Sequence, residues 1–307
     1  MTVKSAEQDG VEAQALKLSG RMRVEQAFAA IVGNCLQHIR ANDRAVAQGR
    51  GMESLHQMRV GLRRLRSALT LFDEPFRLPP AMQNALTVLL DQLGAARDLE
   101  VMLDATLTGD AFAAINGIDT LRAVLREQCR SRQQMVMAET GSRHYLELMG
   151  RVGDWCRQRG WRRTLPAKGR KYARMRLEEV ADSILCQRHR VLRKRARKLH
   201  KADDAARHGA RIAAKKLRYG SEFLQSLYHK RCMRRYLQSL KALQDGLGVL
   251  NDLAVAQRML QALEPQRAGL AACIETVRGQ LGLLAQTRER GLRRLWHQFR
   301  KTELPSL

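Results

Sequence analysis

The stretch His56-Gln57-Met58-Arg59-Val60-Gly61-Leu62-Arg63-Arg64-Leu65-Arg66 returns 152 residues later as His208-Gly209-Ala210-Arg211-Ile212-Ala213-Ala214-Lys215-Lys216-Leu217-Arg218. As a helix, the first copy places a cationic stripe opposite an apolar one. The cationic stripe holds His56, Arg59, Arg63 and Arg66, and the apolar stripe holds Met58, Leu62, Leu65, Leu69 and Phe72. The second copy keeps the cationic stripe as His208, Arg211, Lys215 and Arg218. This pattern predicts two helices that dock in a core and turn their cations toward a shared polyanion.

A second pair of matching segments extends the duplication beyond one helix. Leu93-Gly94-Ala95-Ala96-Arg97-Asp98-Leu99 matches Leu247-Gly248-Val249-Leu250-Asn251-Asp252-Leu253, at an offset of 154 residues. Such a long period indicates two similar halves rather than a solenoid. We predict a flexible N-terminus over 1–11, a first helical half over 12–153 and a second over 154–303.

The spacing of apolar residues predicts an all-α fold. Apolar residues make up 45% of the 307 residues, proline is scarce at six, and apolar side chains recur at intervals of three and four. We expect helices over 12–48, 53–73, 80–106, 110–138, 143–158, 171–200, 204–228, 231–262 and 264–300. Long helices with short connections favour antiparallel bundles.

The sequence shows neither a secretory signal nor an apolar run long enough to span a bilayer, so we expect a cytoplasmic protein with no membrane partner. Its six cysteines include no Cys-x-x-Cys pair. That spacing is typical of reduced, mostly buried thiols rather than of disulfides or a zinc site.

Positive charge is concentrated in the second half. Of the net charge of +25, residues 1–153 contribute +2 and residues 154–307 contribute +23. Self-repulsion of this size disfavours a compact state unless an anion relieves it, which again indicates a polyanionic partner. A merely solvated basic surface is the alternative.

The four motifs, in this order, resemble the CHAD domain, a histidine-bearing α-helical family. The resemblance covers roughly 12–300 and suggests a stand-alone CHAD protein. It implies two four-helix-bundle-like halves, related by a pseudo-twofold axis, around a basic central channel that binds inorganic polyphosphate. It also implies association with polyphosphate granules and their proteins in bacteria.

The resemblance also implies which residues contact the polyphosphate. The channel would be lined by His56, Arg59, Arg63, Arg66, His208, Arg211, Lys215 and Arg218. Arg64 and Lys216 lie off the stripes and would serve a flank. From position alone, Arg193, Lys194, Arg197 and Lys198 would extend the track.

Neither a metal site nor catalysis is expected. The two histidines have arginines nearby rather than acidic or thiol ligands, so they are either pH-sensitive anion contacts or helix-start residues satisfied by the backbone. Asp98 and Asp252 would orient arginines from the helix that follows each basic helix. Without a glycine-rich phosphate loop or an acidic cluster, the sequence predicts no enzymatic activity and no cofactor.

Two other classes of function remain open. A non-specific nucleic-acid-binding protein would share the need for phosphate contacts, but only 5% of residues are aromatic and none lies within the basic stripes. A scaffold that recruits acidic proteins to granules is the third possibility.

Overall fold

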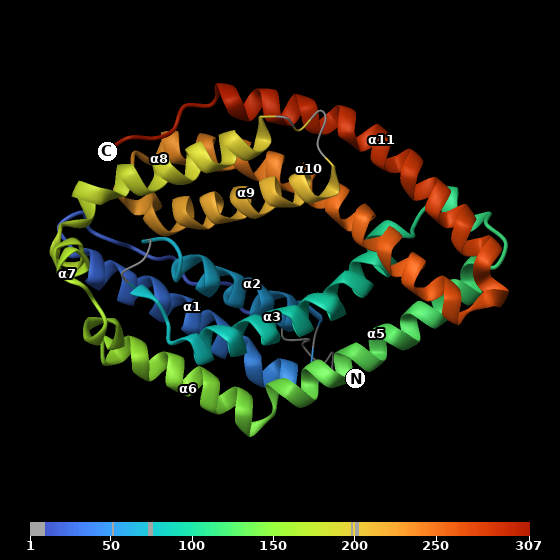
Figure 1. Cartoon of the computed structure of the whole chain (residues 1–307), viewed down its shortest axis with the longest axis horizontal. Helices are drawn as coiled ribbons and strands as arrows, with labels where there is room; N and C mark the ends of the chain where they lie inside the picture. The colour runs from blue at the N-terminus through green and yellow to red at the C-terminus, as the bar shows by residue number, and fades with distance from the viewer. Residues whose placement is uncertain (1–9, 51, 73–75, 198, 200–202) are drawn as a thin grey trace, which may run out of the picture.

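The computed structural model describes residues 10–50, 52–72, 76–197, 199 and 203–307, and over these residues it contains helices and no β-strand. The prediction of an all-α fold is confirmed. Figure 1 shows two groups of helices, one above the other. The first group comprises α1 (Val24–Ala47), α2 (Met52–Ala68), α3 (Pro80–Val101), α5 (Ile118–Thr140) and α6 (Arg143–Arg157), while the short α4 (Asp110–Ala113) lies against α11. The second comprises α8 (Leu177–Ala196), α9 (Asp204–Leu224), α10 (Lys230–Leu263) and α11 (Ala271–Lys301), and α7 (Ala167–Arg174) connects the two.

The two basic helices face each other across the boundary between the groups. In the first group α2 packs against α1, and α3 packs against α5. In the second, α9 contacts both α8 and α10, while α11 lies along α10. Contacts between α2 and α9 join the groups at the centre, and α10 and α11 reach the first group through α3 and α5 (Figure 1).

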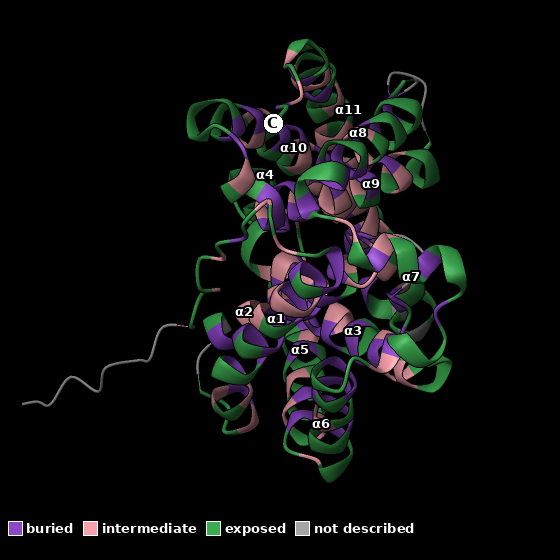
Figure 2. Cartoon of the chain, turned by 90° about the vertical axis from the view of Figure 1, so that its left-hand side faces the viewer, coloured by how far each residue is buried: buried purple, intermediate pink, exposed green. Residues whose placement is uncertain are grey.

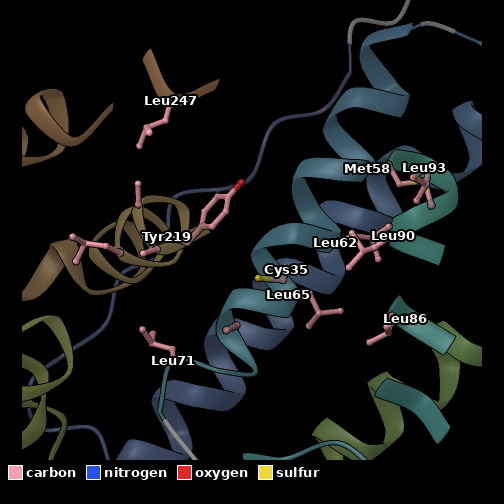
Figure 3. Close-up of a cluster of buried hydrophobic side chains, with 14 of the residues drawn as sticks. Cys35, Met58, Leu62, Leu65, Leu71, Leu86, Leu90, Leu93, Tyr219 and Leu247 are labelled. Carbon is pink, nitrogen blue, oxygen red and sulfur yellow. The ribbon is translucent and has the colours of Figure 1, made fainter. Parts of the chain in front are cut away.

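The buried side of α2 is the predicted apolar stripe. Met58, Leu62 and Leu65 are at most 1% exposed. Figure 3 shows them beside the buried leucines of α3, with Cys35 of α1 in the same cluster. On α9 the buried residues between the cations are largely alanines, which allow α8 and α10 to approach closely. Figure 2 shows that most helices carry buried residues on one side and exposed residues on the other.

The first helix is shorter than predicted. It begins at Val24, not at residue 12, because the backbone of 10–19 bonds to side chains instead. The Asn42 side chain exchanges two hydrogen bonds of 2.8 Å with the backbone of Val11. The Ser226 hydroxyl likewise bonds both the N–H and the C=O of Leu18, at 2.9 and 3.0 Å. Residues 10–19 therefore form a strap that joins α1 to the second group.

The predicted helix over 171–200 is broken between α7 and α8. There Met175 and Arg176 are extended, and they pair with the chain just before α1. Val24 N–H donates to the Met175 C=O at 3.0 Å, and Leu177 N–H donates to the Met22 C=O at 2.8 Å. We call this short antiparallel pairing of Arg23 with Arg176 the seam.

Two further helix boundaries differ from the predictions. The expected helix over 110–138 is interrupted between Ala113, where α4 ends, and Ile118, where α5 begins after Gly117 with its left-handed φ of 82°. The last helix begins at Ala271, after short 3₁₀ turns that include Pro265.

No helix in the described ranges is both long enough and apolar enough to cross a membrane. All six cysteines are free thiols, of which Cys35, Cys129, Cys156 and Cys273 are buried.

Candidate functional site

A cavity of about 1530 Å³ lies between the two groups of helices. Its walls come from α2 and α3 on one side and from α8, α9 and α10 on the other. Ten Lys or Arg side chains line it: Arg59, Arg63, Arg66, Arg77, Arg188, Arg195, Arg211, Lys215, Lys216 and Arg258. Among the described residues, the acidic side chains of the lining are Asp91 and Asp98. The cavity therefore carries a large excess of positive charge.

Four of these cations form what we call the inner cluster: Arg59, Arg63, Arg211 and Lys215. Arg59 is only 6% exposed and forms an ion pair with Asp98, with Nη2 3.6 Å from Oδ1. Arg211 forms the matching ion pair with Asp252 at 3.9 Å. In both arginines the buried Nε lacks a hydrogen-bond partner within the described part of the chain. Each guanidinium is thus oriented by a carboxylate and keeps an unused donor.

Burial, together with repulsion from neighbouring cations, lowers the pKa of Arg59, Arg211 and Lys215. Burial, followed by repulsion from Arg63 and Arg211, lowers the pKa of Lys215 to about 6. Burial and Arg63 lower the pKa of Arg59 to about 10. Two carboxylates are too few to balance four cations here, so the site favours a bound anion.

Four other cations form the outer cluster: Arg66, Arg188, Arg195 and Lys216. Burial lowers the pKa of Lys216, and repulsion from Arg188, Arg66 and Arg195 lowers it further. Arg188 donates to the carbonyls of Thr70 and Leu71, and Arg195 donates to the carbonyl of Gly209 at 3.2 Å. Backbone carbonyls thus orient these two guanidinium groups.

The structure brings seven of the predicted binding residues to the cavity: Arg59, Arg63, Arg66, His208, Arg211, Lys215 and Lys216. Two other predicted residues point elsewhere. Arg64 donates to Asn34 at 2.9 Å and lies over the ring of Phe223. Arg218 donates to Glu222 at 2.7 Å and to Gln244 at 2.8 Å, and its guanidinium lies over the Tyr219 ring. Tyr219 itself projects from α9 toward the gap between the groups (Figure 3).

The cations of α8 that line the cavity are not the predicted ones. Arg193, Lys194 and Arg197 are exposed and lie outside the lining, whereas Arg188 and Arg195 belong to it; Lys198 lies outside the described residues. The buried stripe of α8 explains the difference, because Leu185, His189, Leu192 and Ala196 fix its orientation. Arg188 and Arg195 lie on one flank of that stripe, and Arg193 and Arg197 lie on the other.

The two histidines occupy different surroundings. His208 lines the cavity, and its Nδ1 lies 3.0 Å from the Asn251 side-chain oxygen. His56 is half-buried and does not line the cavity; burial and the nearby Arg97 lower its pKa. Over the described ranges, no three His, Cys, Asp or Glu side chains gather in a way that could hold a metal ion.

Four lining cations were absent from the predicted set: Arg77, Arg188, Arg195 and Arg258. Arg188 and Arg195 belong to the basic segment over 188–198. The sequence does not show which flank of α8 faces the cavity, and for that reason they were missed. Arg77 and Arg258 stand outside both repeated motifs, and nothing in the local sequence distinguishes them from other surface cations.

Comparisons with known proteins agree with this arrangement of helices. The family model described as the CHAD domain matches residues 30–261. The crystal structure of the CHAD domain from the plant Ricinus communis is similar to the chain, with a TM-score of 0.87 and 36% sequence identity. That similarity covers 98% of this chain and 99% of the plant chain. No curated protein matches. The family match and the structural similarity both extend over most of the chain, which therefore belongs to the CHAD domain family.

Proposed function

We propose that the chain binds inorganic polyphosphate in the central cavity and does not act on it as an enzyme. One observation carries this proposal: a cavity of about 1530 Å³ between two groups of helices is lined by ten Lys or Arg side chains but by only two carboxylates within the described residues. The polyphosphate association is that of the family to which the resemblance pointed. Association with polyphosphate granules is part of the same proposal.

The arrangement of the cations favours an extended chain of phosphates over a single phosphate ion. The inner and outer clusters both include residues of α2 and α9, and α8 adds Arg188 and Arg195. Arginine grips phosphate oxygens through its planar fork, whereas lysine acts as a point charge. We infer that the two copies of the repeated motif form facing walls of one channel and that successive phosphates contact first one cluster and then the other.

One wall of the cavity differs in character. The lining residues of α3 are Gln83, Leu86, Thr87, Leu90, Asp91, Gly94, Ala95 and Asp98, so this wall presents no cation. The polymer would therefore run along α2, α9 and α8. Asp98 and Asp252 are paired with arginines and so are poorly placed to hold a catalytic metal, which supports a binding role.

The test is a titration of the protein with long polyphosphate, beside single-stranded RNA and duplex DNA of matched phosphate count, at low and near-physiological salt. Phosphate contacts make affinity fall with salt for every polyanion. We expect polyphosphate binding to persist at physiological salt while nucleic-acid binding is lost. Equal affinities that disappear together would contradict a selective channel and favour non-specific nucleic-acid binding.

A pair of matched variants locates the binding. One variant replaces the pocket cations (Arg63→Gln, Arg66→Gln, Arg195→Gln and Lys216→Gln) and the other the outer face of α8 (Arg190→Gln, Arg193→Gln, Lys194→Gln and Arg197→Gln). Both lose four charges. At about 1.5 kcal/mol or more for each charge-assisted contact, we expect the pocket variant to lose at least roughly 100-fold in affinity. A comparable loss in the outer-face variant would place the polymer outside the cavity.

A further inference from the structure

A second, smaller cavity of about 330 Å³ lies beside the seam, where α7 contacts α1. It shares no lining residue with the central cavity. Its walls are Arg23 and Glu25 at the start of α1, Arg162 and Leu165 before α7, and Arg170, Ala173 and Arg174 on α7. Four arginines and one carboxylate therefore surround a space about one fifth as large as the central one.

The sequence that builds this cavity is itself repeated. Arg21-Met22-Arg23-Val24-Glu25 returns as Arg174-Met175-Arg176-Leu177-Glu178. The two copies pair antiparallel at the seam, where Arg23 lies opposite Arg176. Each copy also begins a helix in the same way, because the Arg23 N–H donates to Gln26 and the Arg176 N–H donates to Glu179. The pairing thus brings Arg23 of one copy and Arg174 of the other to a single cavity.

The carboxylate that lines the cavity, that of Glu25, is already paired with arginines. Glu25 is only 4% exposed, and its two oxygens accept from Arg162 at 2.9 and 2.5 Å. Arg159 approaches the same carboxylate at 3.6 Å. The bond from Arg162 lowers the pKa of Glu25, so the carboxylate stays charged and bound to its partners.

Three guanidinium groups of the lining have no counter-charge from the part of the chain that the structure describes: Arg23, Arg170 and Arg174. Within the described residues none of the three pairs with a carboxylate. Arg170 donates to the Leu165 carbonyl at 2.8 Å, which holds its side chain at the cavity without neutralising it. All three are exposed, so an incoming anion can reach them.

We propose that the seam cavity binds a compact phosphate anion, of the size of pyrophosphate, held by Arg23, Arg170 and Arg174. The planar forks of three arginines match the oxygens of such an anion. Its small volume suits a short phosphate unit, either free pyrophosphate or the end of a longer chain. Because the three arginines belong to α7 and to the residue before α1, the bound anion joins the two sides of the seam.

The experiment uses the full chain carrying the four pocket substitutions Arg63→Gln, Arg66→Gln, Arg195→Gln and Lys216→Gln, so that binding in the central cavity is weakened. Pyrophosphate is titrated by calorimetry, and the melting temperature is followed with and without it. We expect one saturable site per chain and a rise in melting temperature. Absence of both would overturn the proposal.

Further substitutions in this background assign the site. Arg23→Gln with Arg174→Gln should weaken pyrophosphate binding at least tenfold. The matched control, Arg163→Gln with Lys168→Gln, removes two exposed neighbouring charges that do not line the cavity and should leave binding unchanged. Arg170 lies away from the seam backbone, so we expect the single variant Arg170→Gln to fold. Weaker pyrophosphate binding by this variant would support the site even if the double variant does not fold. Equal binding by Arg170→Gln and the control would refute the site.

Two comparisons separate the ligand sources and the two proposals. Long polyphosphate titrated into the same background shows whether a chain end also enters the seam cavity, since it would compete with pyrophosphate there. Free pyrophosphate is the ligand if the long chain does not compete. If the unsubstituted protein fails to bind long polyphosphate yet binds pyrophosphate at the seam, the central channel is wrong and the seam site stands.

Discussion

Helices α2 and α9 carry the same motif but use it differently. Arg59, which is buried, and Arg211, which is half-buried, behave alike because each pairs with an aspartate of the following repeated segment. The last arginines of the two motif copies differ in where their side chains lie. Arg66 is exposed in the central cavity, whereas Arg218, its counterpart, is held away by Glu222. The first copy has Thr70 at the position of Glu222, so it lacks a carboxylate to withdraw Arg66.

The flanking cations show the opposite pattern. In the first copy Arg64 is withdrawn by Asn34 of α1, while in the second copy Lys216 faces the cavity. Each copy therefore places in the central cavity one cation whose counterpart in the other copy points elsewhere. The motif determines which residue types are present, and neighbours outside the motif decide which of them reach the cavity.

The largest expected effect is on stability, at the arginine–aspartate pair that both copies share. Asp98→Ala removes the partner of the buried Arg59, and we expect it to lower the free energy of unfolding by about 1–2 kcal/mol, less than for a fully buried pair because Asp98 is 39% exposed. Chemical denaturation measures the loss. Long polyphosphate should restore more stability to this variant than it adds to the unsubstituted protein, because an anion replaces the missing carboxylate.

Asp252→Ala is the matching control in the other copy. Its ion pair with Arg211 is longer, and burial raises the pKa of Asp252, so the loss should be smaller. A larger loss for Asp252→Ala would mean that the two ion pairs are not equivalent in the way their geometry indicates.

The next effect compares the divergent positions. Arg66→Gln removes a cation of the outer cluster and should weaken polyphosphate binding by about tenfold. Arg218→Gln should change the affinity less than about twofold, because that side chain is bonded to Glu222 and Gln244 outside the cavity. Fluorescence titration of both variants measures the difference, and similar losses would show that Arg218 reaches the polymer after all.

The smallest expected effect is a pH dependence of polyphosphate affinity, which we attribute to the second copy of the motif. The pKa of Lys215 is about 6 in the folded protein, against 10.5 as its ordinary value, whereas its counterpart is Arg63. A polyanion favours the charged lysine, so binding takes up a proton. We expect affinity to rise about threefold to fivefold from pH 8 to pH 6, and calorimetry in buffers of different ionisation heat to register uptake of roughly one third of a proton at pH 7.

Lys215→Arg, which stays charged, is the control and should remove most of this dependence. Stability shifts in the opposite sense to affinity. Because the folded pKa lies below the unfolded one, the unfolded chain binds more protons between pH 6 and 10.5, and the contribution of Lys215 to the free energy of unfolding rises with pH in that window. Proton release on polyphosphate binding would rule out this role for Lys215.

The sequence predicted those features that depend on helical periodicity. The apolar stripe of α2 is buried as expected, and the pairing of Asp98 with an arginine followed from the second repeated segment. Features that depend on tertiary neighbours were missed. The flank of α8 that faces the cavity depends on how its buried stripe docks, and the withdrawal of Arg64 depends on Asn34, thirty residues away. The repeated Arg-Met-Arg segment was readable in the sequence, yet its role at the seam required the fold.

The strap has a consequence for the order of events during synthesis. Leu18 leaves the ribosome early, but Ser226, which bonds both of its backbone groups, follows 208 residues later. At about 5–20 residues per second, that separation corresponds to roughly 10–40 s. During this interval the strap has its partners on α1 but not those in the second group of helices, so the two groups become tied together only when most of the chain has been made.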